Sequence, residues 1–337
     1  MIGAFLIKPK TIELRETTTP ELKPGEVRIR LQKVGICGSD VHLFLGHRLL
    51  EQPTIIGHEA IGIVDKVQSN ITSLKKGDRV VIEPNISCKK CRYCISGRGN
   101  ICINKRVIGV TENGCFAEFI NMPQEFCWQI PDAISDDDAV TIEPAAVAYH
   151  ALSCCSSKPN DAIAILGLGA IGLLITQLAL KLGYKVFVID INETNLQAAT
   201  VMGAIPLHIN NQPEKLIDEI ADLLLQNNVT AVFECAGAEN TASFVMCIAP
   251  RGSEIILVGL STVPASFIPL KIVREGIRII PSIIYNHPND FEKTIQLIQS
   301  KIIAPGKIIS GIYKLAQLQQ ALEAAASGKE TKLVVTI

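Results

Sequence analysis

The chain has 337 residues, of which 48% are hydrophobic and 19% charged, and its formal net charge is -1. This length exceeds the usual size of one domain, so we expect two. The balanced charge gives no broad electrostatic field for nucleic acid or an anionic membrane, and a small-molecule partner is expected instead.

The first ten residues, MIGAFLIKPK, do not have the form of a secretory signal. No basic segment precedes their short apolar run, and no small-residue cleavage site follows it. The longest apolar run, residues 162–180, approaches the length of a membrane span, but glycines interrupt it in a pattern that has another interpretation below. We therefore expect a cytoplasmic protein without a membrane segment.

Residues 1 to about 145 contain short strand patterns. Residues 27–34 alternate apolar and polar side chains, 61–67 and 79–82 are rich in β-branched residues, and Gly25 and Gly77 mark turns. This pattern predicts a compact, mainly antiparallel β domain.

From about residue 161 the rhythm changes. Apolar strands alternate with helical stretches, and the strands read AIAIL, KVFVID, VTAVFEC and EIILVGL. Such alternation is typical of βαβ units in a doubly wound parallel sheet. Two amphipathic stretches, 290–300 and 315–327, and the closing strand KLVVTI lack this rhythm and are expected to return to the first domain. The predicted domains are therefore 1–145 with 284–337, and 146–283.

A dinucleotide-binding fingerprint follows the strand AIAIL. Gly167, Gly169 and Gly172 form G-x-G-x-x-G and open a helix, the context in which the glycines permit a tight turn, close approach of a pyrophosphate and close helix packing. Asp190 ends the next strand, where a carboxylate accepts hydrogen bonds from the ribose hydroxyls of NAD and repels the 2'-phosphate of NADP. Residues 191–193 bring no Arg or Lys, so NAD is favoured. The alternative is a glycine-rich turn with no ligand.

Two groups of residues have metal-ligand chemistry. Cys37, His58 and Glu59 offer a thiolate, an imidazole and a carboxylate, a mixture that suits a catalytic zinc with one position left for a substrate oxygen. Ordinary buried residues are the alternative for three such positions. The second group has the spacing C-x2-C-x2-C-x7-C, typical of a closed structural zinc site in a polar lobe, and consists of Cys88, Cys91, Cys94 and Cys102.

The other cysteines lack ligand spacing. In a reducing compartment clustered cysteines indicate metal binding, and isolated ones serve as small buried hydrophobic residues. We expect that role for Cys115, Cys127, Cys154, Cys155, Cys235 and Cys247.

In this order the motifs GICGSDVH, GHEAIGIV, GDRVVIEP, the four-cysteine lobe, GCFAEF, EPAAVAYHAL and GLGAIG resemble the zinc-dependent medium-chain alcohol dehydrogenases over essentially the whole chain. Glu59 after His58, together with Glu143 in a Glu-Pro pair, is similar to the polyol (sorbitol) dehydrogenase branch and to bacterial relatives that oxidise sugar acids or butanediol. The resemblance implies an α/β protein with a mainly β, GroES-like catalytic domain and a Rossmann domain.

The resemblance also implies roles for individual residues. Cys37, His58 and one of two glutamates, Glu59 or Glu143, bind the catalytic zinc, and the choice between the glutamates stays open. Ser39 and His42 carry the hydroxyl proton towards solvent, and Asp40 orients His58, because a ligating histidine usually has an acceptor behind it.

The expected function is zinc-dependent hydride transfer between a secondary hydroxyl of a polyol, sugar acid or diol and NAD. The resemblance places residues 43–52, with His47 and Arg48, where the family contacts its substrate, and Arg48 would meet a carboxylate or hydroxyl; the alternative for Arg48 is a solvated loop charge. One alternative is a catalytically inactive relative that acts as a cofactor-binding structural or regulatory protein. Another is a non-metal reductase of the quinone type, which would lack both metal groups.

A homodimer or homotetramer is expected, mainly from the resemblance. The strand at 254–260 and the apolar segment after it are expected to lie at the edge of the parallel sheet, where two copies would pair across a two-fold axis. No nucleic-acid or membrane partner is expected.

Overall fold

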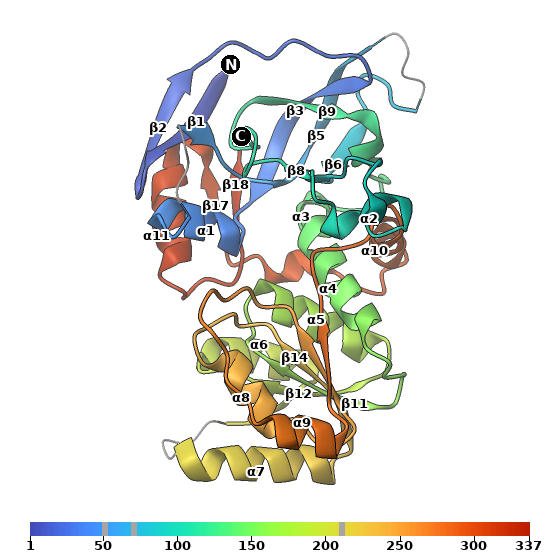
Figure 1. Cartoon of the computed structure of the whole chain (residues 1–337). Helices are drawn as coiled ribbons and strands as arrows, with labels where there is room; N and C mark the ends of the chain where they lie inside the picture. Colours follow the sequence, from blue (N-terminus) through green and yellow to red (C-terminus); the bar gives the residue numbers. More distant parts are fainter. Residues whose placement is uncertain (49–52, 69–72, 209–212) are drawn as a thin grey trace. The chain divides into compact units, whose positions relative to one another are not determined.

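The computed structural model describes residues 1–48, 53–68, 73–208 and 213–337 (Figure 1). The chain divides into two compact units, one formed by Met1–Glu143 with Phe291–Ile337 and the other by Pro144–Asp290. The limits predicted above remain a prediction about independently folding domains.

Strands from distant parts of the chain form the first unit. Its larger sheet has the order β10-β6-β5-β3-β18-β17, with β9 also paired to β3, and a smaller sheet has the order β2-β1-β4. The strands are β1 (Ile2–Lys8), β2 (Thr11–Glu16), β3 (Glu26–Gly35), β4 (Thr54–Ile55), β5 (Glu59–Val67), β6 (Arg79–Ile82), β7 (Asn85–Ile86), β8 (Arg106–Val107), β9 (Phe119–Pro123), β10 (Cys127–Gln129), β17 (Gly311–Lys314) and β18 (Leu333–Thr336).

Short helices complete this unit. They are α1 (Gly38–Leu45), α2 (Arg92–Ile95), α3 (Asp136–Val140), α10 (Asn289–Gln299) and α11 (Leu318–Ala326), with 3-10 turns η1 (Gly99–Ile101), η2 (Gln124–Phe126), η3 (Pro305–Ile308) and η4 (Leu315–Gln317). Helix α4 (Ile142–Cys154) begins at the boundary between the units and continues into the second, and the first two residues of α10 also belong to the second unit. Helices α1 and α11 pack together.

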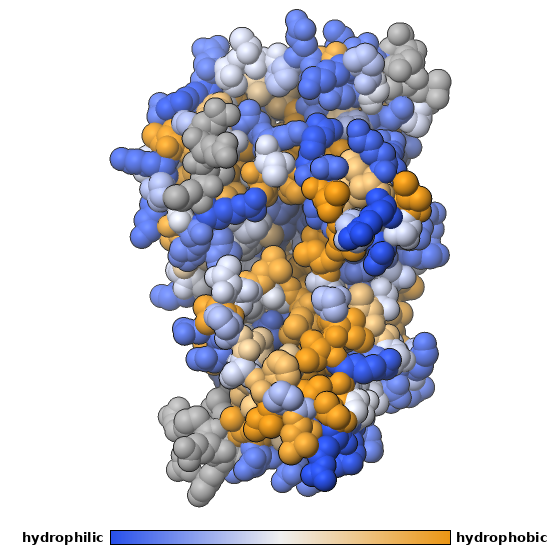
Figure 2. Space-filling view, in the orientation of Figure 1, coloured by the Kyte–Doolittle hydropathy of each residue, from blue (hydrophilic) through white to orange (hydrophobic). Residues whose placement is uncertain are grey.

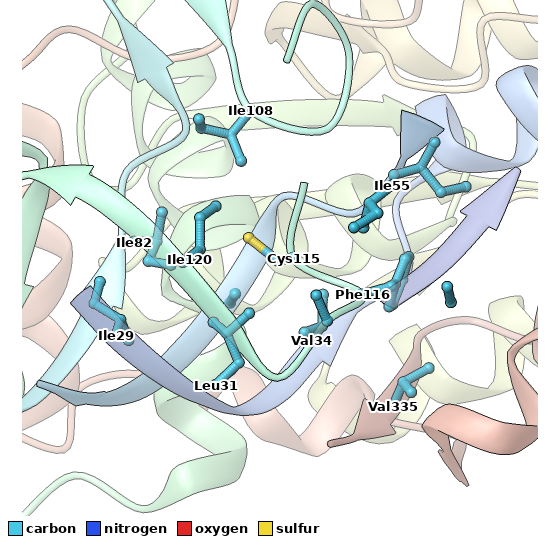
Figure 3. Close-up of a cluster of buried hydrophobic side chains, with 14 of the residues drawn as sticks. Ile29, Leu31, Val34, Ile55, Ile82, Ile108, Cys115, Phe116, Ile120 and Val335 are labelled. Carbon is cyan, nitrogen blue, oxygen red and sulfur yellow. The ribbon is translucent and has the colours of Figure 1, made fainter. Parts of the chain in front are cut away.

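Strand β3 is central because its side chains alternate. Val27, Ile29 and Leu31 are buried and face the core, as the period-2 pattern predicts. Figure 3 shows β3 residues converging with Phe116 and Cys115 of the loop before β9. Each large apolar side chain removed from water in this way contributes about 1.5–3 kcal/mol, which fixes the strand's register.

The antiparallel pairing of β3 has a consequence for the site. Strand β5 begins opposite the end of β3, with Glu59 paired to Gly35, and β18 pairs on the other side of the same end, with Val334 opposite Gly35. Three segments that are far apart in sequence therefore meet where β3 ends.

The second unit has the predicted doubly wound parallel sheet. The strand order is β13-β12-β11-β14-β15-β16, with every neighbouring pair parallel. The strands are β11 (Ala162–Leu166), β12 (Lys185–Ile189), β13 (Ile205–Pro206), β14 (Val229–Glu234), β15 (Glu254–Leu257) and β16 (Arg278–Pro281). The order reverses between β11 and β14, and ligands of such sheets bind at the strand ends beside this reversal.

Helices of this unit pack in two groups. Helices α5 and α6 pack against each other and against β12, and α7 and α8 pack against each other and against β14 (Figure 1). The helices are α5 (Ala170–Lys181), α6 (Glu193–Met202), α7 (Pro213–Gln226), α8 (Thr241–Ile248) and α9 (Pro269–Glu275). Among the described residues no helix is both long and apolar enough to cross a bilayer.

The expected position of the strand at 254–260 is wrong. Strand β15 lies inside the sheet, because β16 pairs along its outer side. The sequence pattern does not predict strand β16, because the strand has only four residues and follows α9 closely. The sheet edge on this side is therefore β16.

Candidate active site and metal centres

Cys37 lies at the start of helix α1, directly after β3. Its backbone is extended, as an N-cap residue requires, and its N–H donates to the Asp40 carboxylate at 2.9 Å. Glycine is required at position 35, the last residue of β3, because a Cβ there would collide with the Glu59 carboxylate. The turn from strand to helix is thus built around the carboxylates of Asp40 and Glu59.

His58 and Glu59 are held against the same turn. Gly57 has a φ of +92°, which favours glycine, and its N–H donates to Asp40 Oδ1 at 3.1 Å. Asp40 is fully buried, and its two carboxylate oxygens accept the N–H groups of Cys37 and Gly57. Asp40 therefore connects the chain before His58 to the chain at Cys37.

The donor atoms of Cys37, His58 and Glu59 all lie within 4.8 Å of one another. His58 and Glu59 are buried, and Cys37 is half-buried. The Nδ1 atom of His58 lies 3.5 Å from Asp40 Oδ1, so the other ring nitrogen is left for a metal. A thiolate, an imidazole and a carboxylate in this space fit one zinc ion with a position open to substrate.

Electrostatics favour a cation at this point. Burial lowers the pKa of His58, but Asp40 and Cys37 outweigh burial and raise it well above the usual value. The negative groups that hold a proton on His58 are the groups that would attract a metal ion in its place.

Lys332 is a further residue of this site, and sequence reasoning missed it. It precedes β18, is buried, and donates from Nζ to the Glu59 carboxylate and to the Ile36 carbonyl oxygen at 3.0 Å. Burial lowers the pKa of Lys332, but Glu59, Cys37 and Glu143 outweigh burial and raise it. The ammonium therefore stays charged beside the three metal donors.

Glu143, the other candidate ligand, is buried in the first turn of α4. It lies outside the group whose donor atoms come within 4.8 Å, although its charge acts on Lys332. The structure thus brings Glu59, rather than Glu143, into direct reach of Cys37 and His58.

The predicted relay residues all lie on α1. Ser39 is half-buried two residues after Cys37, and His42 is exposed one turn further along. The His42 Nδ1 atom lies 3.1 Å from Nδ1 of His47, a contact in which one ring donates and the other accepts. Arg48 is exposed, while positions 49–52 of the expected substrate loop lie outside the described residues.

The four-cysteine lobe has the geometry of a closed zinc site. The sulfur atoms of Cys88 and Cys94 are 4.0 Å apart, those of Cys91 and Cys94 3.5 Å, and those of Cys91 and Cys102 3.9 Å. A tetrahedron with Zn–S bonds near 2.3 Å has edges of about 3.8 Å. The three separations are close to this edge length, and all four sulfur atoms lie within 4.8 Å of one another, so the lobe fits one zinc ion.

Backbone N–H groups of the lobe point at these sulfurs. The Cys88 N–H donates to Cys102 Sγ at 3.3 Å, and the N–H of Cys94 is the chief cause that lowers the pKa of Cys91 to about 6. Such donors stabilise thiolates, the form that binds zinc.

The glycines of the fingerprint occupy three different environments. Gly167 has a φ of +89°, and a Cβ there would lie 2.6 Å from the Ala236 nitrogen, while a Cβ on Gly172 would collide with the Gly167 carbonyl. A Cβ on Gly169, which caps α5, would meet no atom within 4 Å. The space beside Gly169 is where a pyrophosphate would face the helix N-terminus.

Asp190 is bound to this glycine-rich turn. Its Oδ2 accepts the Leu168 N–H at 2.5 Å, and its Oδ1 accepts the Asn192 N–H at 2.7 Å. The carboxylate thus fixes the turn as well as lying where a ribose is expected.

The expectation for the isolated cysteines is wrong in part. Cys115 and Cys127 are buried as expected, but Cys247 is exposed and Cys154, Cys155 and Cys235 are half-buried. Sequence spacing excludes a metal role and gives no information about which side of a helix or strand end a cysteine occupies.

A Rossmann unit with a dinucleotide turn, joined in one chain to a β unit with an open mixed-ligand site and a closed four-sulfur site, defines a zinc-dependent dehydrogenase. Family comparison agrees: residues 23–132 match the alcohol dehydrogenase GroES-like domain, and residues 170–300 match the zinc-binding dehydrogenase domain. The chain belongs to the zinc-dependent medium-chain alcohol dehydrogenase family, whose members act on CH–OH groups.

Individual relatives align over the whole chain. Sorbitol dehydrogenase of Bacillus subtilis (strain 168) is 32% identical over 346 residues, which cover 100% of this chain and 97% of the relative. An alcohol dehydrogenase (rspB) of Escherichia coli CFT073, solved with NADH, has a TM-score of 0.92 and 29% identity and covers 100% and 99% of the two chains. A zinc-binding dehydrogenase of Sinorhizobium meliloti 1021, solved with NADP, has a TM-score of 0.92 and 28% identity, with coverage of 100% and 99%.

Proposed function

We propose that this protein is an NAD-dependent dehydrogenase that interconverts a secondary hydroxyl of a polyol, sugar acid or diol and the corresponding ketone. The observation that carries the proposal is the mixed set of donors from Cys37, His58 and Glu59 within 4.8 Å, in a chain that also has the dinucleotide turn. When bound, zinc polarises the hydroxyl oxygen and the nicotinamide accepts the hydride.

The ligand roles follow from the contacts of each side chain. Cys37, His58 and Glu59 would hold the zinc, and Asp40 would keep His58 in the orientation that presents its free ring nitrogen. Lys332 binds the Glu59 carboxylate and so controls how much of its charge is offered to the metal.

The proton of the hydroxyl must leave as well as the hydride. Ser39 lies two residues from Cys37 and would take part first, and His42 and His47 would pass the proton to solvent through their Nδ1 contact. Both imidazoles are exposed, so the outer end of this path exchanges with water.

The NAD preference rests on the residues around Asp190. Its carboxylate is fixed by two backbone N–H groups and would repel a 2'-phosphate. Ile191 is 94% exposed and Glu193 follows at the start of α6, so the segment offers an anionic phosphate no cation. A structural neighbour binds NADP, which makes cofactor choice a property of this local sequence and not of the fold.

The substrate class is supported by hydrogen-bonding groups at the end of α1. His47 and Arg48 are exposed donors that suit hydroxyl or carboxylate oxygens better than an alkyl chain. Similarity to a sorbitol dehydrogenase over the full chain supports a vicinal diol within a polyol or sugar acid.

We also propose that two copies associate through the second unit. Figure 2 shows apolar side chains gathered on one surface of the second unit, over α9 and the chain before it. The exposed apolar residues there are Leu260, Val263, Phe267, Ile268, Leu270, Val273 and Ile279. Ile279 lies on the edge strand β16, whose outer side a second β16 would pair with across a two-fold axis. A cytoplasmic location is supported by the eleven cysteines, none of which is paired in a disulfide.

The test is a substrate panel with the zinc-loaded protein. Sorbitol and other polyols, aldonic acids, 2,3-butanediol and simple primary alcohols are supplied with NAD, and NADH absorbance is followed. We expect turnover with polyols or sugar acids and none in Cys37→Ser. Absence of turnover with every compound, in protein shown to contain zinc and bind NADH, would favour the inactive cofactor-binding alternative.

A further inference from the structure

A second cluster of reactive side chains lies in the Pro144–Asp290 unit, apart from the metal ligands. The His150 Nδ1 atom lies 2.8 Å from Asp290 Oδ2, and its Nε2 atom lies 3.7 Å from Cys154 Sγ. His150 and Cys154 are four residues apart on α4, a spacing that places them on the same helix face. Asp290 comes from a segment 140 positions away.

The three side chains differ in burial. His150 and Asp290 are buried, and Cys154 is half-buried. The Asp290 Oδ2 atom also accepts the Asn286 N–H at 2.6 Å, which fixes the carboxylate. The ring of His150 therefore has one orientation, with Nδ1–H towards Asp290 and Nε2 towards the sulfur.

We propose that Cys154 is a redox-modification site, a nucleophilic thiol that small peroxides oxidise to a sulfenic acid with His150 and Asp290 supporting the reaction. The order carboxylate, imidazole, thiol is the arrangement that activates a sulfur nucleophile in proteins. Neither NAD nor zinc takes part in this reaction.

The charge of His150 supports this assignment. Burial lowers its pKa, but the hydrogen bond to Asp290 and the contact with Cys154 outweigh burial and raise the pKa of His150 to about 9. At neutral pH the ring is therefore an imidazolium, and its Nε2–H stabilises negative charge on the sulfur.

The proposed step is balanced as follows. The Cys154 sulfur attacks one peroxide oxygen, a sulfur–oxygen bond forms and the oxygen–oxygen bond breaks. The sulfur loses two electrons, and the leaving hydroxide or alkoxide takes the proton from His150 and departs as water or alcohol.

Cys155 does not complete a disulfide with its neighbour. Consecutive Cα atoms lie about 3.8 Å apart, below the range of about 4.4–6.8 Å that disulfides adopt. Its Sγ donates to the Leu152 carbonyl at 3.1 Å, and burial raises its pKa. The sulfenic acid on Cys154 would therefore be reduced by a small thiol from solution.

The test measures sulfenic-acid formation in the zinc-loaded full-length protein. A Cys155→Ser background is treated with hydrogen peroxide below one equivalent and with dimedone, and labelled peptides are quantified by mass spectrometry. Cys247, exposed on α8, is the internal comparison. Because the imidazolium of His150 faces the Cys154 sulfur at 3.7 Å, we expect Cys154 to react about tenfold faster than Cys247.

Two variants separate activation from simple accessibility. His150→Gln removes the cation and should bring the rate ratio of Cys154 to Cys247 close to one, and Asp290→Asn should lower it partly. Cys154→Ser should leave dehydrogenase turnover unchanged. A ratio near one in the parent, or an unchanged ratio in a folded His150→Gln variant, would overturn the proposal. If His150→Gln lowered the melting temperature but left the rate ratio of Cys154 to Cys247 as in the parent, the cluster would serve stability alone.

Discussion

Lys332 and Glu59 form a buried ion pair at the centre of the candidate active site, although they are 273 positions apart in sequence. The same carboxylate lies within 4.8 Å of the donor atoms of Cys37 and His58. Glu59 therefore faces two cations, the resident ammonium on one side and the metal that Cys37 and His58 would recruit on the other. Lys332 also donates to the Ile36 carbonyl at 3.0 Å, so its position does not depend on Glu59 alone.

Replacing Lys332 with Met tests this relationship. Removing one partner of a buried ion pair leaves a buried charge, which costs about 3–5 kcal/mol. We expect this loss of unfolding free energy in metal-free protein and a smaller loss in zinc-loaded protein, because zinc supplies the missing positive charge. Urea unfolding with and without a chelator measures the difference.

The matched control is Lys329→Met, since Lys329 is an exposed lysine three positions earlier. It should change the unfolding free energy by less than about 0.5 kcal/mol in both states. Equal destabilisation of Lys332→Met with and without zinc would show that the ammonium and the metal do not share Glu59.

Cofactor choice should depend on the charge of Asp190. Combining Asp190→Ser with Ile191→Arg exchanges a repulsive carboxylate for a partner of the 2'-phosphate. The ratio of kcat/KM for NADP to that for NAD should rise by tenfold or more, and a tenfold change corresponds to about 1.4 kcal/mol. Total activity should fall, because Asp190 also accepts the N–H groups of Leu168 and Asn192.

Asp190→Asn separates these two effects. It removes the charge and keeps one of the two acceptor oxygens, so it should weaken NAD discrimination, with a stability loss of about 1–3 kcal/mol for the N–H group that loses its acceptor. If the parent protein already uses NADP better than NAD under matched conditions, the interpretation of this strand end is wrong.

The sequence predicts elements well where one local pattern determines them. Strands β11 and β12 are continuous apolar runs bounded by turns, and the glycine fingerprint identifies the turn between β11 and α5. Strand β16 was missed because four residues, half of them apolar, carry too little periodicity.

The site is predictable only in part for the same reason. The motifs around Cys37 and His58 carry a local signal, but a lysine before the closing strand carries none. Lys332 reaches Glu59 only because β18 pairs with the end of β3, and such long-range pairing is set by tertiary packing. The contact of Asp290 with His150 is invisible in the sequence on the same ground.

The ion pair of His150 predicts a pH-dependent stability. Its folded-state pKa is raised to about 9 from an ordinary value of 6.5, so the protonated form stabilises the fold. This contribution is fully present below about pH 6.5 and is lost as the pH rises through about 9. The melting temperature of the parent should exceed that of His150→Gln at pH 6, and the two should converge above pH 9. A constant difference across this range would contradict the assignment.

The association surface is tested by charge at an exposed apolar position. Val273 on α9 is 78% exposed, so Val273→Glu should leave the fold of a single chain intact while placing a carboxylate in the proposed interface. Light scattering at micromolar concentration should report a dimer or tetramer for the parent and a shift towards monomer for the variant. Val201→Glu, an equally exposed apolar position on α6, is the control and should not dissociate it. A monomeric parent would remove the proposal.

The two metal sites should respond differently to the loss of one sulfur. Cys37→Ser removes a ligand from an open site attached to a well-packed core, so the protein should stay folded and bind NAD while turnover is lost. Cys94→Ser breaks a closed site that stabilises a polar lobe, and the melting temperature and solubility should fall, with activity lost as a consequence of unfolding.

Metal analysis decides between these expectations. One closed and one open site give about two zinc ions per chain in the parent and about one in each variant. Cys247→Ser, which changes an exposed thiol outside both groups, should keep both ions and full activity. Among the described residues, the four-cysteine lobe and the group of Cys37, His58 and Glu59 are the sets of His, Cys, Asp and Glu side chains with metal-binding spacing. A Cys37→Ser protein that retained two zinc ions and most of its turnover would therefore show that the donors brought together by β3, α1 and β5 are not the catalytic centre.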